Sequence, residues 1–239
     1  GFNIHSGSSP MWFENIRGLW NGDEGFSCHE NCECYVRGGE FSHNYWHGIA
    51  DVGIARTHYQ NLICRDNRSK GIYLIGSMHS ISDSEVSGSP IQIVLSASDQ
   101  RGLPRFDAMP LRTSLTNLRN VVVRSRPDEA GVMLTRGAVG VIEHCVILGG
   151  RTCLQVDAEA SAYVLNSIIA GGQTTEVVAA GAYAAEHNLY FPGRFVINGT
   201  TYTPEQFADY GAATDNDHSS FIEEPKFIGD TLVVSKSSH

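Results

Sequence analysis

The sequence has few basic residues and no long apolar run. Lys and Arg together number 17 against 26 Asp and Glu, which gives a formal net charge of −9 and a pI near 5.5. Because nucleic-acid binding needs clustered basic side chains to neutralise phosphates, this scarce and scattered set argues against a nucleic-acid partner. No apolar run approaches the roughly 18 residues of a membrane-spanning helix, so we expect no membrane insertion.

Cysteine is sparse for the length of the chain. The six cysteines are too dispersed through 239 residues for a small disulfide-stapled scaffold. They are Cys28, Cys32, Cys34, Cys64, Cys145 and Cys153. A disulfide from Cys32 or Cys34 to a neighbouring turn would suit secretion, and the sequence leaves the pairing open. The chain opens Gly1-Phe2-Asn3 without Met or a basic leader, so we expect a processed or excised piece with no signal peptide.

The remaining composition is typical of a globular protein with many tight turns. Hydrophobic residues make up 41% and charged residues 18%, which is too apolar for a disordered chain. The length suits one large all-β domain or two small domains. Glycine accounts for 25 residues, or about one in ten against a usual ~7%. This surplus predicts a chain that turns often.

A short apolar strand opened by a small residue recurs along the chain. Its first three copies, residues 25–28, 48–51 and 71–74, start 23 residues apart. Later copies are residues 90–93, 131–134, 153–156 and 176–179. A second strand, closed by Gly, Asn or Asp, lies between these copies at residues 40–44, 62–67, 85–88, 145–150 and 167–172. Such residues permit the positive φ of tight corners.

These repeats predict an all-β fold, a single-stranded right-handed parallel β-helix with turns of ~22 residues that stack about 4.8 Å apart. Leucine-rich repeats share the period, but their leucine spacing is missing and no helix fills each repeat. An immunoglobulin-like sandwich would not explain strands that recur in phase. We therefore expect residues 1–239 to form one domain, which can be incomplete at its N-terminus, with Phe41, Cys64 and Val86 in one interior column.

Two segments interrupt the repeat. Residues 97–116 contain two prolines and three arginines, which predicts a loop that leaves the coil. Residues 198–239 are expected to hold one short helix and a closing segment. Thr203 can cap this helix, Pro204 suits its first turn, and Gln206 completes a capping box.

The closing segment carries a first resemblance. Its letters include Glu186-His187-Asn188-Leu189-Tyr190-Phe191, then Thr203-Pro204-Glu205-Gln206-Phe207, then Asp217-His218-Ser219-Ser220 and Glu224-Pro225-Lys226-Phe227. This ending resembles that of right-handed, pectate-lyase-like β-helix proteins that act on carbohydrates. The resemblance implies the fold and says little about chemistry.

The letters around His29 carry a second resemblance. They run Gly25-Phe26-Ser27-Cys28-His29-Glu30, then Val36-Arg37, His43-Asn44 and Gly48-Ile49-Ala50-Asp51, then Asp66-Asn67-Arg68-Ser69-Lys70-Gly71. Residues 12–95 resemble the catalytic module of the mannuronan C5-epimerases, whose active-site turn reads Gly-Phe-Asp-Pro-His-Glu. Two key residues differ, because the family's tyrosine is Glu24 here and its aspartate is Ser27. The resemblance implies a polysaccharide substrate.

Strand alternation predicts where the site lies. If Phe26 points inward, Ser27 and His29 point outward, and Ser27, Ala50 and Tyr73 form an outer column. An extended sugar chain can lie on such a flat sheet. The residues expected to contact substrate are Ser27, Asp51, Tyr73, His47, Trp46 and Tyr45. For Trp46, capping the interior at its corner is an equal alternative.

Proton abstraction at C5 of a uronic acid requires a base and a partner for the carboxylate. His29 is the acid–base candidate because its ordinary pKa is near 6.5. Arg68 and Lys70 are the candidate carboxylate partners. The alternative is that all three are solvated surface residues.

A metal is a further alternative. Asp23 and Glu24, with Asp51, are candidates for a Ca²⁺ site that neutralises the carboxylate, although acidic turns are more often solvated. Cys28 and His29 belong to a Cys–His pattern that invites zinc, but alternation puts them on opposite faces of the strand. We therefore expect no cofactor, or Ca²⁺.

The sequence thus predicts a secreted or cell-surface protein that acts on a uronic-acid-containing polysaccharide as a lyase or C5-epimerase. A non-catalytic carbohydrate-binding, adhesive or structural module is the alternative, favoured by the replaced tyrosine and aspartate. A glycoside hydrolase would need two carboxylates about 5–9.5 Å apart, for which Asp23 or Glu24 with Asp51 could serve. The oligomeric state is left open.

Overall fold

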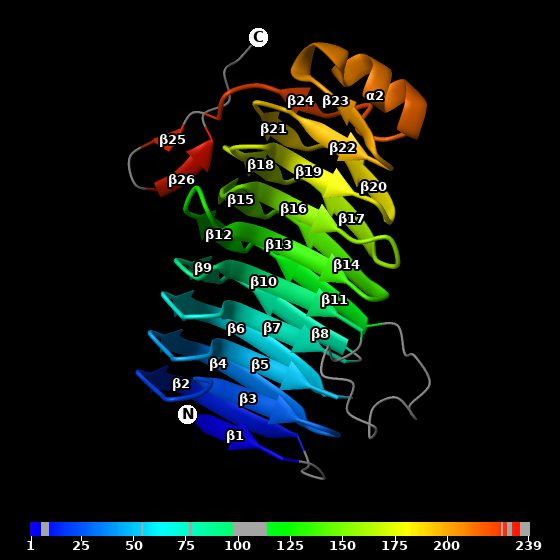
Figure 1. Cartoon of the computed structure of the whole chain (residues 1–239). Coiled ribbons are helices and arrows are strands. Elements are labelled where there is room, and N and C mark those ends of the chain that lie inside the picture. Colours follow the sequence, from blue (N-terminus) through cyan, green and yellow to red (C-terminus); the bar gives the residue numbers. More distant parts are fainter. Residues whose placement is uncertain are drawn as a thin grey trace.

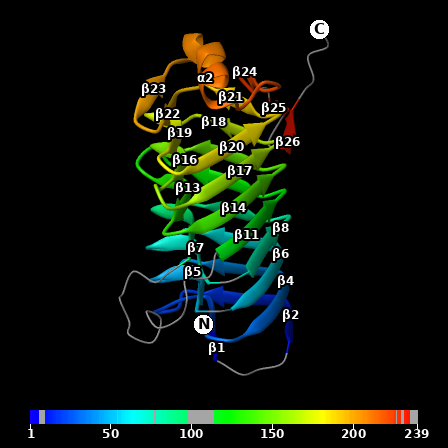
Figure 2. The ribbon, with the colours of Figure 1, turned by 90° about the vertical axis from the view of Figure 1, so that its right-hand side faces the viewer.

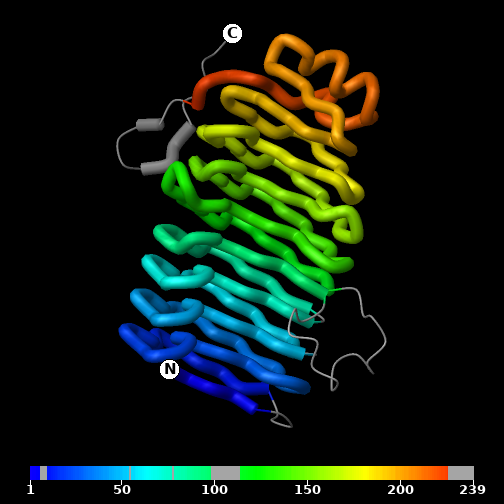
Figure 3. The backbone as a smooth tube through the Cα atoms, in the orientation of Figure 1, coloured from blue at the N-terminus to red at the C-terminus, as the bar shows by residue number. Residues whose placement is uncertain are grey.

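The protein is a parallel β-solenoid of about 7 turns, as the repeat predicts (Figure 1). The computed structural model describes residues 1–5, 10–53, 55–76, 78–97, 114–225, 227–228 and 231–234. Successive turns of the backbone stack along one axis from the N-terminus to the C-terminal helix (Figure 3). Within the described residues, no helix has both the length and the apolar character to cross a membrane.

Two sheets form the wall of the solenoid. Sheet A has ten strands, in the spatial order β1 (Phe2–Ile4), β3 (Phe26–His29), β5 (His47–Val52), β7 (Lys70–Ile75), β10 (Ile91–Ser96), β13 (Ala130–Thr135), β16 (Thr152–Val156), β19 (Thr175–Ala179), β22 (Phe195–Ile197) and β23 (Thr200–Tyr202). All its neighbours pair in parallel except β22 and β23. The early turns have a spacing of 23 residues, because Phe26 lies beside Ile49 and Ile49 beside Ile72.

Sheet B has fourteen strands and covers the other side (Figure 2). Its first half contains β20 (Ala182–Glu186), β17 (Ser161–Leu165), β14 (Ala138–Glu143), β11 (Ser114–Arg119), β8 (Met78–Ser82) and β6 (Arg56–Arg65). It continues through β9 (Glu85–Ser87), β12 (Val122–Ser125), β15 (Val146–Gly149), β18 (Ile168–Ala170), β21 (Leu189–Phe191) and β24 (Phe221–Ile222). Strands β2 (Met11–Leu19) and β4 (Glu33–Ser42) extend it beside β6. A separate antiparallel pair joins β25 (Phe227–Ile228) and β26 (Thr231–Val234).

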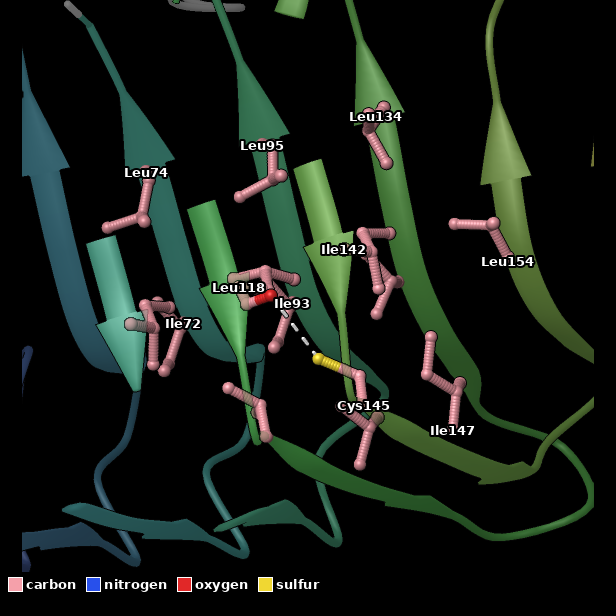
Figure 4. Close-up of a cluster of buried hydrophobic side chains, with 14 of the residues drawn as sticks. Ile72, Leu74, Ile93, Leu95, Leu118, Leu134, Ile142, Cys145, Ile147 and Leu154 are labelled. Carbon is pink, nitrogen blue, oxygen red and sulfur yellow. Dashed lines mark hydrogen bonds between the residues drawn. The ribbon is translucent and has the colours of Figure 1, made fainter. Parts of the chain in front are cut away.

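The core lies inside the coil, where equivalent side chains stack from turn to turn. Phe26, Ile49, Ile72 and Ile93 are all completely buried at equivalent positions of sheet A. Figure 4 shows the continuation of such columns, with Ile72 and Ile93 from neighbouring turns facing side chains of sheet B. The predicted interior residues Phe41, Cys64 and Val86 are likewise fully buried. Burial of one apolar side chain per turn is the main stabilising contribution to a solenoid.

Polar ladders hold the corner that leads from sheet B to sheet A. The Asn44 side-chain amide donates to Asn67 Oδ1 at 3.0 Å, and Asn21 donates to Asn44 Oδ1 at 2.8 Å. The residues just before them adopt a positive φ, with His43 at 59° and Asp66 at 54°. The predicted tight corners are therefore present, with the expected Asp at position 66, whereas His43 occupies a position for which Gly, Asn or Asp was expected.

The predicted helix closes the C-terminal end. A 3₁₀ turn η1 (Pro204–Gln206) leads into α2 (Phe207–Thr214), and Thr203 with Gln206 forms the expected capping box. Tyr210 of this helix is fully buried and stacks on Phe195 at 4.6 Å between ring centres. The helix thus covers the apolar end of the core.

The loop expected over residues 97–116 does not extend to residue 116. Residues 98–113 lie outside the described residues. Ser114, which the sequence pattern assigned to the loop, instead begins β11 and pairs with Ala138 of β14. The reason is burial. Ser114 and Thr116 are buried on the same face of the strand as Leu118, so these polar residues belong to the solenoid and not to a loop.

Candidate functional site

The outer face of sheet A carries the column that alternation predicts. Ser27, Ala50 and Tyr73 lie side by side on β3, β5 and β7, while Phe26 and Ile49 point into the core. All three are nevertheless buried. Tyr73 belongs to an apolar cluster separate from the core, together with Val52, Ile75 and Val94 and the partly buried Ile91 and Met133. This column is therefore not an open groove floor.

A lysine and three aromatic rings meet at the start of β5 and β7. The Lys70 ammonium lies 4.6 Å from the centre of the Tyr73 ring, and that ring packs edge-on against His47 at 5.4 Å. His47 lies 5.4 Å from Trp46, and its backbone pairs with Lys70. We call Trp46, His47, Lys70 and Tyr73 the lysine–aromatic group. It unites four residues that the sequence indicated one by one.

The members of the lysine–aromatic group differ in exposure. Trp46 is 48% exposed, whereas His47 is buried. Burial lowers the pKa of Lys70, because a charged amine is poorly solvated beside aromatic rings. A ligand carboxylate would oppose this shift by stabilising the ammonium form. The group therefore offers the exposed indole of Trp46 and the Lys70 amine, whose protonated form a ligand carboxylate would stabilise.

A second contact between a cation and an aromatic ring lies at the adjoining corner. The Arg68 guanidinium carbon is 4.9 Å from the centre of the Tyr45 ring, and both side chains are exposed. The Arg68 backbone amide donates to the Asn44 carbonyl oxygen at 3.0 Å, so the stacking of the corners positions the pair. Arginine presents paired N–H donors that suit a carboxylate.

His29 lies at the opposite end of its strand from these residues. Its Nε2 is 3.1 Å from the Ser27 hydroxyl, which contacts Asn3, and its ring stacks on His5 at 5.0 Å. The register aligns His29 with Val52, whereas Lys70 aligns with His47. Five residues along a strand correspond to roughly 16 Å. The structure does not bring His29 together with Lys70 or Arg68.

Asp51, expected among the substrate-binding residues, is an interior residue. It shares the register position of Cys28, so strand alternation points it into the coil. Its carboxylate accepts hydrogen bonds from the Thr57 hydroxyl at 2.6 Å and the Tyr59 hydroxyl at 2.7 Å. The carboxylate is completely buried and cannot contact a polymer on the outer face.

Asp51 belongs to a buried polar cluster that also contains Thr57, Tyr59 and His79. His79 Nδ1 lies 2.8 Å from the Thr57 hydroxyl and 3.5 Å from Asp51 Oδ2. Burial raises the pKa of Asp51 to about 7, although the hydrogen bonds from Thr57 and Tyr59 lower it in part. Burial and the charge of His58 lower the pKa of His79 to about 3. His79 is therefore neutral above that pH, and Thr57 links it to Asp51 by hydrogen bonds rather than an ion pair.

The acidic residues considered for Ca²⁺ do not converge. Asp23 is exposed and Glu24 is half-buried on the turn before β3, while Asp51 lies inside the coil. Over the described ranges, no group of three or more His, Cys, Asp or Glu side chains is placed to hold a metal ion. Cys28 is in the core and His29 is partly exposed, so the two do not share a site.

The corner before sheet A carries functional candidates that the sequence pattern did not reveal. Trp20 is 75% exposed and stacks on His43 at 4.4 Å, and His43 Nδ1 lies 4.0 Å from Asp66. The signal was available, because these residues lie 23 apart. Asp66 also pairs with Arg126 Nη2 at 3.0 Å. Asp66 and Arg126 line a pocket of about 380 Å³, together with Arg68 and with Gly88 and Pro90 of the corner between them.

An aromatic ladder on sheet B was also missed. Trp12, Tyr35 and His58 occupy paired positions of β2, β4 and β6. Their rings stack at 4.1 and 4.7 Å, and Trp12 is 73% exposed. Again the 23-residue spacing is the signal. The ladder lies on the other sheet from the lysine–aromatic group, so it gives a matched set of aromatic residues outside the candidate site.

The comparisons with known proteins leave the family open. No protein-family model matches this sequence, and no curated protein matches it either. The assignment of function therefore depends on the geometry of the surface.

Proposed function

We propose that the protein binds a uronic-acid-containing polysaccharide through the lysine–aromatic group and the neighbouring Tyr45–Arg68 pair. The observation that carries the proposal is the pairing of a cation with an aromatic ring at both places. Aromatic rings pack against the apolar faces of sugars, and Lys and Arg bind their carboxylates. With a net charge of −9, the chain needs such a local cationic surface to hold a polyanion.

The placement of the other candidates favours binding over catalysis. A C5 base and a carboxylate partner must act on the same sugar, yet His29 and Lys70 belong to opposite ends of the strands. The interior position of Asp51 removes another polar group from the outer face. We therefore favour the non-catalytic module, and we propose that it acts outside the cell or at the cell surface, where such polymers occur.

One observation supports a lyase or C5-epimerase as the second candidate. Burial lowers the pKa of Lys70, so a larger fraction of the amine is in the neutral form that can accept a proton. In that reaction the neutral amine would take the C5 proton while Arg68 stabilises the carboxylate. A lyase would then form the C4–C5 double bond as the bond from C4 to the glycosidic oxygen breaks, and the departing oxygen would take a proton from water. An epimerase would instead add a proton from water to the opposite face of C5. His29 would have no direct part in this version.

Binding is tested by calorimetry and affinity electrophoresis with alginate, pectate and a glycosaminoglycan, with a neutral glucan as control. We expect saturable binding to at least one uronate polymer and none to the glucan. Absence of binding to all three uronate polymers would contradict the proposal. Formation of unsaturated uronate, followed by ultraviolet absorbance, or inversion at C5, followed by NMR, with and without Ca²⁺, would establish the catalytic candidate.

The location of the site is tested by a matched pair of tryptophan variants. Trp46→Ala should weaken binding about fivefold, because it removes a stacking surface. Trp12→Ala removes a more exposed indole on sheet B and should change affinity by less than about twofold. Equal losses of affinity in the two variants would contradict the placement of the binding site on sheet A.

A further inference from the structure

Two thiols meet across the corner between β3 and β4. Cys28 Sγ and Cys34 Sγ are 3.1 Å apart, and both side chains are completely buried. Two cysteines of later turns contact the backbone instead, with Cys145 Sγ 3.4 Å from the Leu118 carbonyl oxygen and Cys153 Sγ 3.2 Å from that of Gly149. A separation of 3.1 Å leaves about 1 Å to close before the sulfurs reach bonding distance.

The next turn shows that these two positions face each other by construction. Asp51 takes the place of Cys28 and Thr57 that of Cys34, each at an offset of 23 residues. Across this equivalent corner the Thr57 hydroxyl donates to Asp51 Oδ2 at 2.6 Å. Side chains at the two positions are thus directed at one another in successive turns, and the Cys28–Cys34 contact follows from the backbone path.

We propose that Cys28 and Cys34 form a disulfide when the chain folds in an oxidising environment. The oxidant is a small-molecule disulfide such as oxidised glutathione. The thiolate of one cysteine attacks this disulfide and releases one small thiol; the second cysteine then displaces the other. Two protein thiols become one S–S bond, and the oxidant is reduced to two thiols. The proposal is independent of polysaccharide binding.

The burial of the two thiols determines when the bond forms. Cys28 and Cys34 are completely buried in the closed turn, so a small-molecule disulfide reaches them before the turn closes, and afterwards the bond resists reduction without denaturant. A hydrogen bond with Cys34 and burial also raise the pKa of Cys28, and burial raises that of Cys32. Cys32 is the competitor, since its thiol lies nearby and donates to the His29 carbonyl oxygen at 2.8 Å.

The test starts with the wild-type chain refolded in a glutathione redox buffer. Thiol titration in denaturant should find that four of the six cysteines have free thiols. Peptide mapping without reductant should identify a disulfide between Cys28 and Cys34. Six free thiols would overturn the proposal, as would a bond that uses Cys32. This measurement needs no variant.

A thermal comparison adds a second readout. Reductant during refolding should lower the midpoint of wild type, and of the control Cys153→Ser, by about 5 °C. Cys34→Ser should show no such response, because it has no bond to lose. If Cys34→Ser does not fold, Cys32→Ser replaces it and should retain the full response of wild type. A response in Cys34→Ser, or a lost response in Cys32→Ser, would contradict the pairing.

Discussion

The outer face and the interior of the first turns hold two different sets of titratable groups. Lys70 and His47 lie outside sheet A among aromatic rings, whereas Asp51 and His79 lie inside the coil, linked by Thr57. Ala50 and Asp51 are adjacent in sequence but belong to these two different regions. Alternation along a strand therefore separates groups that stabilise the fold from groups that can meet a ligand.

The largest expected effect is on stability and comes from the interior. Asp51→Ala removes the acceptor of the Thr57 and Tyr59 hydroxyls and leaves both donors buried without it. We expect the free energy of unfolding to fall by about 3 kcal/mol in chemical denaturation. Asp51→Asn keeps an acceptor and should lose less. Polyuronate affinity of the folded Asp51→Ala protein should not change; a loss would place Asp51 in the binding site.

The pH dependence of stability separates the two buried groups. The pKa of Asp51 is raised to about 7 in the folded state. Its contribution to the free energy of unfolding is therefore fully present below the unfolded-state pKa near 3.9 and is lost as the pH rises through 7. The pKa of His79 is lowered to about 3, so its contribution is present above about 6.5 and is lost as the pH falls toward 3. Between about pH 4 and 6.5 the two slopes oppose one another and cancel.

Single substitutions should expose each slope. His79→Gln leaves Asp51 alone, and stability should fall by about 1.4 kcal/mol per pH unit as the pH rises from 4 to 6.5. Asp51→Asn leaves His79 alone, and stability should rise by the same amount over that interval. Chemical denaturation at four pH values measures the free energy of unfolding of each variant, and the difference from wild type is compared across the pH values. Parallel curves in all three proteins would contradict the buried protonation states.

The outer face should show the reverse pattern. Lys70→Ala removes the ammonium beside Tyr73, and we expect polyuronate affinity to fall about tenfold at low salt while the unfolding midpoint changes little. Lys70→Arg keeps the charge and should recover part of the affinity. Calorimetry measures the binding and thermal denaturation the stability. A stability loss without an affinity loss would assign Lys70 to packing.

The smallest effect is expected at the other end of the strand. His29 lies with Ser27 and His5, away from Lys70. His29→Ala should therefore change polyuronate affinity by less than about twofold. The same calorimetric titration checks this, with Lys70→Ala as the reference. An affinity loss as large as that of Lys70→Ala would extend the site along the whole strand.

The sequence predicted the solenoid because the fold depends on spacing and alternation, which are visible in the letters. The recurring strands, the column of Phe41, Cys64 and Val86, and the capping box at Thr203 all follow from local rules. The same rules would have assigned Asp51 to the interior, since it shares the register of Cys28. The sequence alone was therefore sufficient to place Asp51 in the interior.

Other features depend on packing that one sequence does not display. Tyr73 points outward as expected, yet neighbouring side chains bury it. The distance between His29 and Lys70 follows from their places along the strands, which a shared outer face does not reveal. The bridge from Arg126 to Asp66 joins residues 60 apart across an interrupted repeat, so spacing alone could not find it.

Tryptophan fluorescence tests the central claim most directly, because the chain has three tryptophans and one belongs to the lysine–aromatic group. A Trp12→Phe, Trp20→Phe variant leaves Trp46 as the single indole. Titration with a uronate polymer should change its emission along a saturable curve that gives the same Kd as calorimetry. Binding detected by calorimetry with constant Trp46 emission would contradict the account and place the polymer on another surface.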